Sequence, residues 1–151
     1  MYTEIIPKIK SVLEGVVLYE VDGIEYKPVI YPYPLEEGEN PKKYPAIMFF
    51  PTNMNNDFST TAQNFKQINF TAILLVSGEK INQEKTFTEV MPNAVDVVIK
   101  ELDKGWDFGD IDGCRTWSRA DATLWGVDTN QSGRYAFAEI NIIIKLQTNN
   151  E

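Results

Sequence analysis

Apolar residues recur three or four positions apart in two stretches of the chain, which is the spacing that gathers side chains on one face of a helix. In the first stretch these residues are Ile5, Ile9, Val12 and Leu13. In the second stretch they are Met91, Ala94, Val95, Val98 and Leu102. Thr3 suits the cap of the first helix, and Gly105 suits the end of the second. The pattern therefore predicts helices over about 3–14 and 88–104.

The segment after the first helix has the pattern of a β-hairpin. Two runs typical of strands, 16–21 and 24–31, are separated by Asp22-Gly23. Both central residues of a tight hairpin turn must tolerate positive φ, and Asp-Gly is among the pairs that do so best. An N-terminal β-hairpin around Asp22-Gly23 is therefore expected.

Prolines punctuate the next part of the chain. Four of them fall within residues 32–45, and proline removes a strand hydrogen-bond donor. We therefore expect a Pro-rich exposed connection over 32–45. The apolar run 44–50, ended by Pro51, predicts a buried strand. The segment 52–64 is rich in Asn and Thr, and it predicts a polar loop.

Three later segments alternate between apolar and polar residues, as half-buried strands do. They cover 65–76, 114–127 and 134–147, and the polar connection 128–133 predicts that the last two form an antiparallel hairpin. Strands of this length span about 40 Å, far beyond the usual five or six residues. Such strands either project beyond their domain or pair with another chain.

The order of these elements is helix, sheet, helix and two closing strands. A chain of 151 residues matches one domain by its length. The predicted fold class is thus α+β, a single domain over 1–151 with a mostly antiparallel or mixed β-sheet packed by the two helices. The two long C-terminal strands complete the sheet.

Charge and composition narrow the classes of function. The formal net charge is −8, which argues against nucleic-acid binding because phosphate contacts need clustered Lys and Arg. Cys114 is the only cysteine, so no internal disulfide can form. The N-terminus has no basic region followed by a long apolar run, so neither a secretory signal nor a membrane span is expected.

Candidate chemistry is sparse, because the chain contains no histidine. The acidic group Asp107, Asp110 and Asp112 lacks the ligand spacing of a calcium loop, which favours a plain turn. Cys114 has no histidine to act as its base. We therefore expect no catalytic residue, no cofactor and no metal site. An enzyme that works with carboxylates alone remains open.

Aromatic residues along the penultimate strand are the best candidates for an interaction surface. Trp106, Phe108, Trp117 and Trp125 lie before or within it, and the alternation places Arg119 on the same side as Trp117 and Trp125. Tryptophan is a common anchor at protein interfaces. The alternative is that these rings pack in the core against the second helix.

The whole pattern resembles the tail terminator (tail completion) proteins of long-tailed bacteriophages. The similar parts are the helix at 3–14, the strand at 44–50, the long strand ending at Leu74-Leu75-Val76, the helix at 91–103 and the closing strands with their tryptophans. That family has no catalytic signature, so no functional residue is carried over. The hairpin at Asp22-Gly23 and the Pro-rich connection are elaborations on the family pattern.

The resemblance implies a structural virion protein. Such proteins form a homo-oligomeric ring, typically a hexamer, that caps the tail tube, ends its polymerisation and joins the tail to the head connector. The implied partners are other copies of the chain, the tail tube protein and the head–tail connector protein, while genomic DNA passes through without specific binding. The location would be the virion tail and neck, after assembly in the host cytoplasm. Another phage neck or connector protein, or a small ligand-binding α+β domain, are the alternatives.

Overall fold

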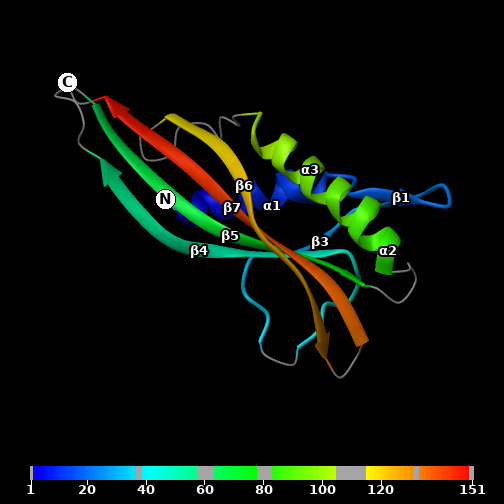
Figure 1. The fold of residues 1–151 in the computed structure, drawn as a ribbon. Helices are drawn as coiled ribbons and strands as arrows, with labels where there is room; N and C mark the ends of the chain where they lie inside the picture. Colours follow the sequence, from blue (N-terminus) through cyan, green and yellow to red (C-terminus); the bar gives the residue numbers. More distant parts are fainter. Residues whose placement is uncertain are drawn as a thin grey trace.

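Two helices cover one face of a five-stranded sheet (Figure 1). The computed structural model describes residues 2–36, 39–57, 63–77, 83–104, 115–130 and 133–149. The helices are α1 (Tyr2–Glu14) and α3 (Met91–Leu102), and α3 is preceded by the short turns α2 (Gln83–Lys85) and η1 (Thr86–Val90). Together these elements form one α+β domain, as the sequence predicts.

The sheet is mixed, with the strand order β3-β4-β5-β7-β6. Only the β3–β4 pair is parallel, and the other three pairs are antiparallel. The strands are β3 (Val29–Tyr31), β4 (Ala46–Asp57), β5 (Gln63–Ser77), β6 (Arg115–Asn130) and β7 (Gly133–Asn149). Figure 1 shows that the long strands extend past the helices at both ends of the sheet.

The N-terminal hairpin forms where the sequence predicts it. Strands β1 (Tyr19–Val21) and β2 (Ile24–Tyr26) pair in a separate two-stranded sheet. The turn residues Asp22 and Gly23 have φ angles of 53° and 77°. The predicted second arm, 24–31, is divided at Lys27-Pro28, and its last part joins the main sheet as β3. The described residues of 32–45 then form the connection to β4, and most of them are exposed.

The predicted polar loop at 52–64 is wrong for most of its length. Strand β4 continues through Pro51 as far as Asp57, and β5 begins at Gln63. Proline is tolerated there because β3 pairs only with residues 46–48 of β4, so the missing N–H of Pro51 lies on an open edge. The ladder shifts register between Pro51 and Asn53, and the Thr52 hydroxyl donates to the Asn69 carbonyl at 3.1 Å.

The second helical segment starts earlier than predicted. The sequence predicts a helix that starts at about residue 88, but the helical turns begin at Gln83 and run directly into α3. The Thr88 hydroxyl instead donates to the carbonyl of Glu84 at 2.8 Å, one turn back within the helical segment. Residue 88 therefore lies inside a longer helical segment.

One hydrophobic core joins both helices to the same face of the sheet. Helix α1 contacts β3, while α3 contacts β6 and β7. The predicted apolar stripe of α3 is buried, and so is the alternating apolar face of β7, namely Ala136, Ala138, Ile140, Ile142, Ile144 and Leu146. We call the opposite face, which includes Phe137, Glu139 and Ile143 of β7, the outer face of the sheet. None of the helices in the described segments has the length and apolar character needed to cross a membrane.

Candidate interaction surface

The described residues hold little that resembles a catalytic or metal centre. No three of their His, Cys, Asp or Glu side chains are close enough together to hold a metal ion. The acidic group Asp107, Asp110 and Asp112 and the thiol Cys114 lie outside the described residues. Burial, and to a lesser degree the neighbouring Tyr26, raises the pKa of Tyr19 to about 12. This phenol stays neutral, and it stacks on Tyr26 with ring centroids 5.1 Å apart, which is a packing role.

Strand β6 forms one edge of the sheet, and its second half exposes large apolar side chains. Leu124 is 51% exposed and Trp125 is 40% exposed. The register shift between Ala122 and Leu124 precedes both of them. Leu124 lies opposite Glu139 and Trp125 lies opposite Ala138, so the two side chains occupy opposite faces of the sheet. Leu124 and Trp125 therefore present exposed apolar side chains on both faces of this edge strand.

The first half of β6 is covered by the C-terminal end of α3. The Ser118 hydroxyl donates to the Leu102 carbonyl, and the backbone N–H of Ala120 donates to the Asp103 carboxylate at 2.9 Å. The second bond satisfies a backbone N–H at the edge of the sheet, where an unpaired strand would otherwise accept another chain, and the first holds the end of α3 against β6. Beyond the register shift β6 curves away from α3 (Figure 1). We call residues 124–130, the part of β6 beyond this contact, its exposed half, after the exposed side chains of Leu124 and Trp125.

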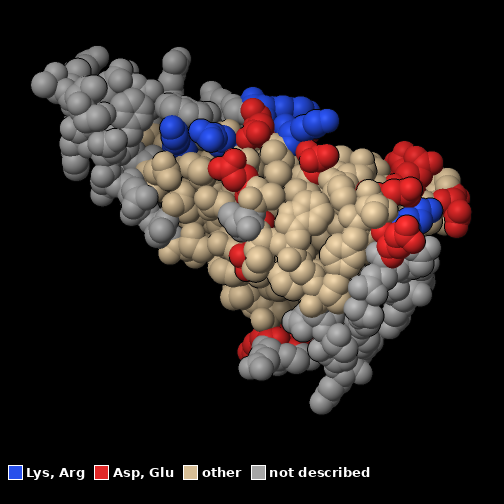
Figure 2. Space-filling view, viewed as in Figure 1, with Lys and Arg blue, Asp and Glu red and all other residues tan. Residues whose placement is uncertain are grey.

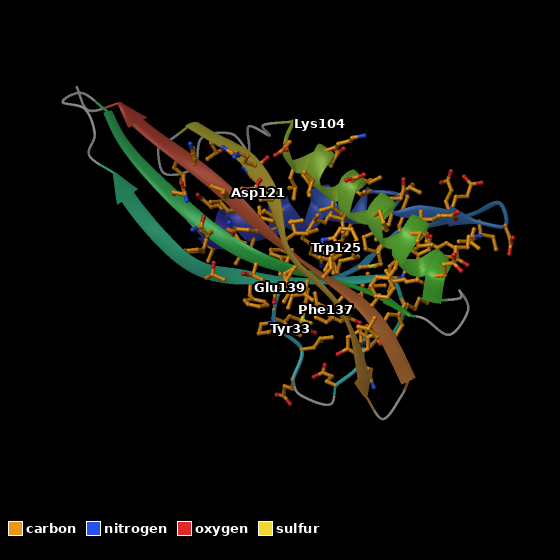
Figure 3. All side chains as sticks on the ribbon, in the orientation of Figure 1. Tyr33, Lys104, Asp121, Trp125, Phe137 and Glu139 are labelled. Atoms are coloured by element: carbon orange, nitrogen blue, oxygen red, sulfur yellow. The ribbon has the colours of Figure 1, made fainter. Side chains whose placement is uncertain are left out.

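A glycine shapes the outer face beside the exposed half. Gly126 lies opposite Phe137 of β7, and an added Cβ at position 126 would approach the Phe137 ring to 2.8 Å. The ring can lie against β6 only because position 126 has no side chain. Figure 3 shows Phe137 and Glu139 close to Tyr33 in this view, and Tyr33 is itself 50% exposed.

The structure separates the five predicted interface residues. Trp106 and Phe108 lie outside the described residues, and only the backbone of Trp117 is described, opposite Lys145. Arg119 and Trp125 are both exposed on β6. They are on opposite faces, so the prediction that Trp125 shares a side with Trp117 and Arg119 is wrong.

The cause is the extra residue at the register shift, which reverses the alternation. Arg119 lies opposite Ile143 on the outer face, while Trp125 lies opposite the core residue Ala138. Leu124, which sequence reasoning missed, takes the outer-face position instead. A single extra residue leaves no mark in an alternating pattern that is apolar on both sides, as at Leu124-Trp125.

The largest group of acidic side chains visible in Figure 2 belongs to the β1–β2 hairpin rather than to β6. Figure 2 shows acidic side chains gathered at the end of the molecule that carries the β1–β2 hairpin, whose acidic residues are Glu20, Asp22 and Glu25. Residues 124–130 contain one acid, Asp128, and no Lys or Arg. No protein-family model and no curated protein sequence matches the chain. The interpretation of this surface therefore depends on its own geometry.

Proposed function

We propose that the protein is a structural virion protein whose copies form a ring on the tail tube of a long-tailed bacteriophage. The ring ends tube polymerisation and joins the tail to the head connector. The observation that supports this proposal is the exposed half of β6, where Leu124 and Trp125 present apolar surface on an open sheet edge. Apolar side chains at the edge of an otherwise well-packed fold are typical of a protein–protein contact.

The proposed ring requires two different patches on each copy. In a closed ring each subunit meets its neighbours through two unlike surfaces, and the rotation between copies closes the circle. The sheet has two unlike edges, β6 on one side and β3 with β4 on the other. These two unlike edges support the proposal of a closed ring.

The charge of the chain agrees with a ring through which DNA passes. The formal net charge of −8 repels the phosphate backbone, so a DNA duplex would not be retained. A ring that bound DNA tightly would obstruct both packaging and ejection. An acidic ring with low affinity for DNA lets the duplex pass without any specific contact.

The decisive experiment measures tube capping. Purified protein is added to polymerising tail tube protein from the same phage, and tube lengths and tube ends are recorded by negative-stain electron microscopy. We expect shorter tubes with a ring at one end, and a ring mass that is an integer multiple of 17.2 kDa. Antibodies against the chain should label the head–tail junction of intact particles.

Two outcomes would contradict the proposal. Tube lengths that do not change at any protein concentration would exclude a terminator role. A chain that stays monomeric both alone and with tubes, and that antibodies do not find in the particle, would exclude a structural role in the virion.

A further inference from the structure

We infer that the exposed half of β6 pairs in an antiparallel ladder with the distal half of β4 in a neighbouring copy of this chain, so that the sheet continues from one subunit to the next. This inference rests on the proposed function, because it names the contact that closes the proposed ring. It depends on which backbone groups the two strands turn outward. It also depends on the protection of the other sheet edges.

The outward groups of β6 follow from its pairing with β7. The N–H of Ala120 points away from β7 toward Asp103, and outward positions alternate along an antiparallel strand. The register shift between Ala122 and Leu124 moves that alternation by one residue. Beyond the shift, the outward positions are Trp125, Val127 and Thr129.

The outward groups of β4 follow in the same way. The carbonyl of Pro45 accepts from Val29 of β3, so odd-numbered positions face the outer edge as far as Pro51. After the register shift between Pro51 and Asn53, the backbone N–H and C=O groups of the even-numbered positions point toward the outer edge. Beyond the shift, these positions are Met54 and Asn56.

Within the described part of the five-stranded sheet, every other edge carries a feature that opposes pairing. Strand β3 has three residues and lies between Pro28 and Pro32. The start of the open part of β4 contains Pro51, which has no N–H to donate. The first half of β6 is covered by α3, as described above. Edge strands are commonly protected by short length, proline or coverage in this way.

The two remaining edges fit each other. Within one sheet β6 and β4 run in opposite directions, because the three antiparallel pairs β4–β5, β5–β7 and β7–β6 reverse the strand direction three times. Two copies in the same orientation therefore bring β6 against β4 as antiparallel strands, with both helical layers on one side. Residues 124–130 and 52–57 contain no Lys or Arg, the charged residues that often protect an edge.

A specific register satisfies the outward groups. With Val127 opposite Met54 of the neighbouring copy, Trp125 falls opposite Asn56, and each pair exchanges two backbone hydrogen bonds. The backbone registers also match, since position 54 lies opposite the core residue Ile68 and position 125 lies opposite the core residue Ala138. The register shift next to Pro51 ends the ladder on that side.

This register offsets each copy along the strand direction. Within one sheet Gly126 lies level with Ala46, through Phe137 and Leu75. In the inter-copy ladder Gly126 would lie opposite Asn55, nine positions further along β4, which is an offset of about 30 Å. A constant offset inclines the strands to the ring axis, as closure of a β-barrel requires.

The first test removes one outward donor. Val127→Pro deletes an N–H that does not pair with β7, so the monomer should fold, but the inter-copy ladder loses a bond and gains a clash. The matched control Val127→Thr keeps the N–H and the β-branched shape. We expect rings from the control and at least a tenfold loss of rings from the proline variant, measured by sedimentation and electron microscopy.

The second test traps the contact and does not depend on the proline variant folding. In a Cys114→Ser background, Val127→Cys and Met54→Cys are combined in one chain. Paired Cα atoms in such a ladder are about 5.5 Å apart, within the range of a disulfide. Oxidation should give a ladder of covalent oligomers on a denaturing gel, and either cysteine alone should give none.

The outcomes separate this inference from the proposed function. Rings that survive Val127→Pro and give no covalent ladder would overturn the inference and leave the capping function standing. Dimers from Val127→Cys alone would show that β6 pairs with itself, which also overturns it. A wild-type chain that neither forms rings nor caps tubes would remove both.

Discussion

The contact between Gly126 and Phe137 predicts that the effect of Gly126→Ala on the free energy of unfolding depends on the residue at position 137. The substitution should not stabilise the wild-type chain, but it should stabilise a chain without the Phe137 ring. An alanine Cβ at position 126 would lie 2.8 Å from the Phe137 ring, whereas ordinary contacts are wider by well over half an ångström. Overpacking of this kind lowers the free energy of unfolding by about 1–3 kcal/mol. Because the Phe137 ring is half-buried and can move aside, we expect a loss near the lower end of that range. Replacing glycine in a strand also stabilises by about 0.4–1 kcal/mol through the unfolded chain.

The two effects can be separated by a double-mutant cycle. Gly126→Ala should be neutral or destabilising by up to about 1 kcal/mol in the wild-type chain. In the Phe137→Ala background the clash is absent, and the same change should stabilise by about 0.5 kcal/mol. The assay is urea denaturation of the four chains at one protein concentration, followed by tryptophan fluorescence. An equal effect of Gly126→Ala in both backgrounds would show that the ring does not constrain position 126.

Three further predictions concern the core, the covered edge and pH. Leu102→Ala should lower the free energy of unfolding by about 2–5 kcal/mol because the Leu102 side chain is 0% exposed. Leu124→Ala, at a site that is 51% exposed, should change it by less than about 0.5 kcal/mol, and equal losses in denaturation would contradict the assigned burial. Asp103→Ala should destabilise by about 1 kcal/mol because the Ala120 N–H loses its acceptor, while Asp103→Asn should retain most of the stability; hydrogen exchange at Ala120 reports the bond directly. Burial raises the pKa of Tyr19 from 10.0 to about 12, so the stability that the neutral phenol contributes is complete below pH 10 and is lost as the pH rises toward 12. Tyr19→Phe should therefore flatten the decline of the denaturation midpoint over this pH range, and an unchanged pH profile would refute the assignment.

Local patterns predicted the elements that local forces determine. The apolar stripe of α3 and the alternating face of β7 are buried as their spacing indicates, because each periodicity reflects one face of one element. The turn at Asp22-Gly23 is equally local, since it depends only on which residues tolerate positive φ. No knowledge of the rest of the fold is needed for any of these.

The failures have a non-local cause. Pro51 would end β4 only if a neighbouring strand needed an N–H at that position. Strand β3 is too short to reach position 51, and the sequence of β4 does not contain the length of β3. The face of Trp125 depends on one extra residue in β6 relative to β7, which is a property of the pair. The sequence therefore placed Trp117, Arg119 and Trp125 on one strand correctly but assigned Trp125 to the wrong face of the sheet.

The register shift in β6 also has a consequence for how the surface can vary. Between the pairs at Ala122 and Leu124, β6 uses one residue more than β7, and Thr123 is that residue. A chain lacking Thr123 would have an uninterrupted ladder in which Leu124 still lies opposite Glu139 and Trp125 opposite Ala138. If Thr123 were instead kept and paired with Glu139, every later side chain of β6 would exchange faces. The indole would then leave the helical side and the leucine would enter it, with no change in their identities. Whether this one residue is bulged or paired thus determines which chemistry the molecule presents at its rim.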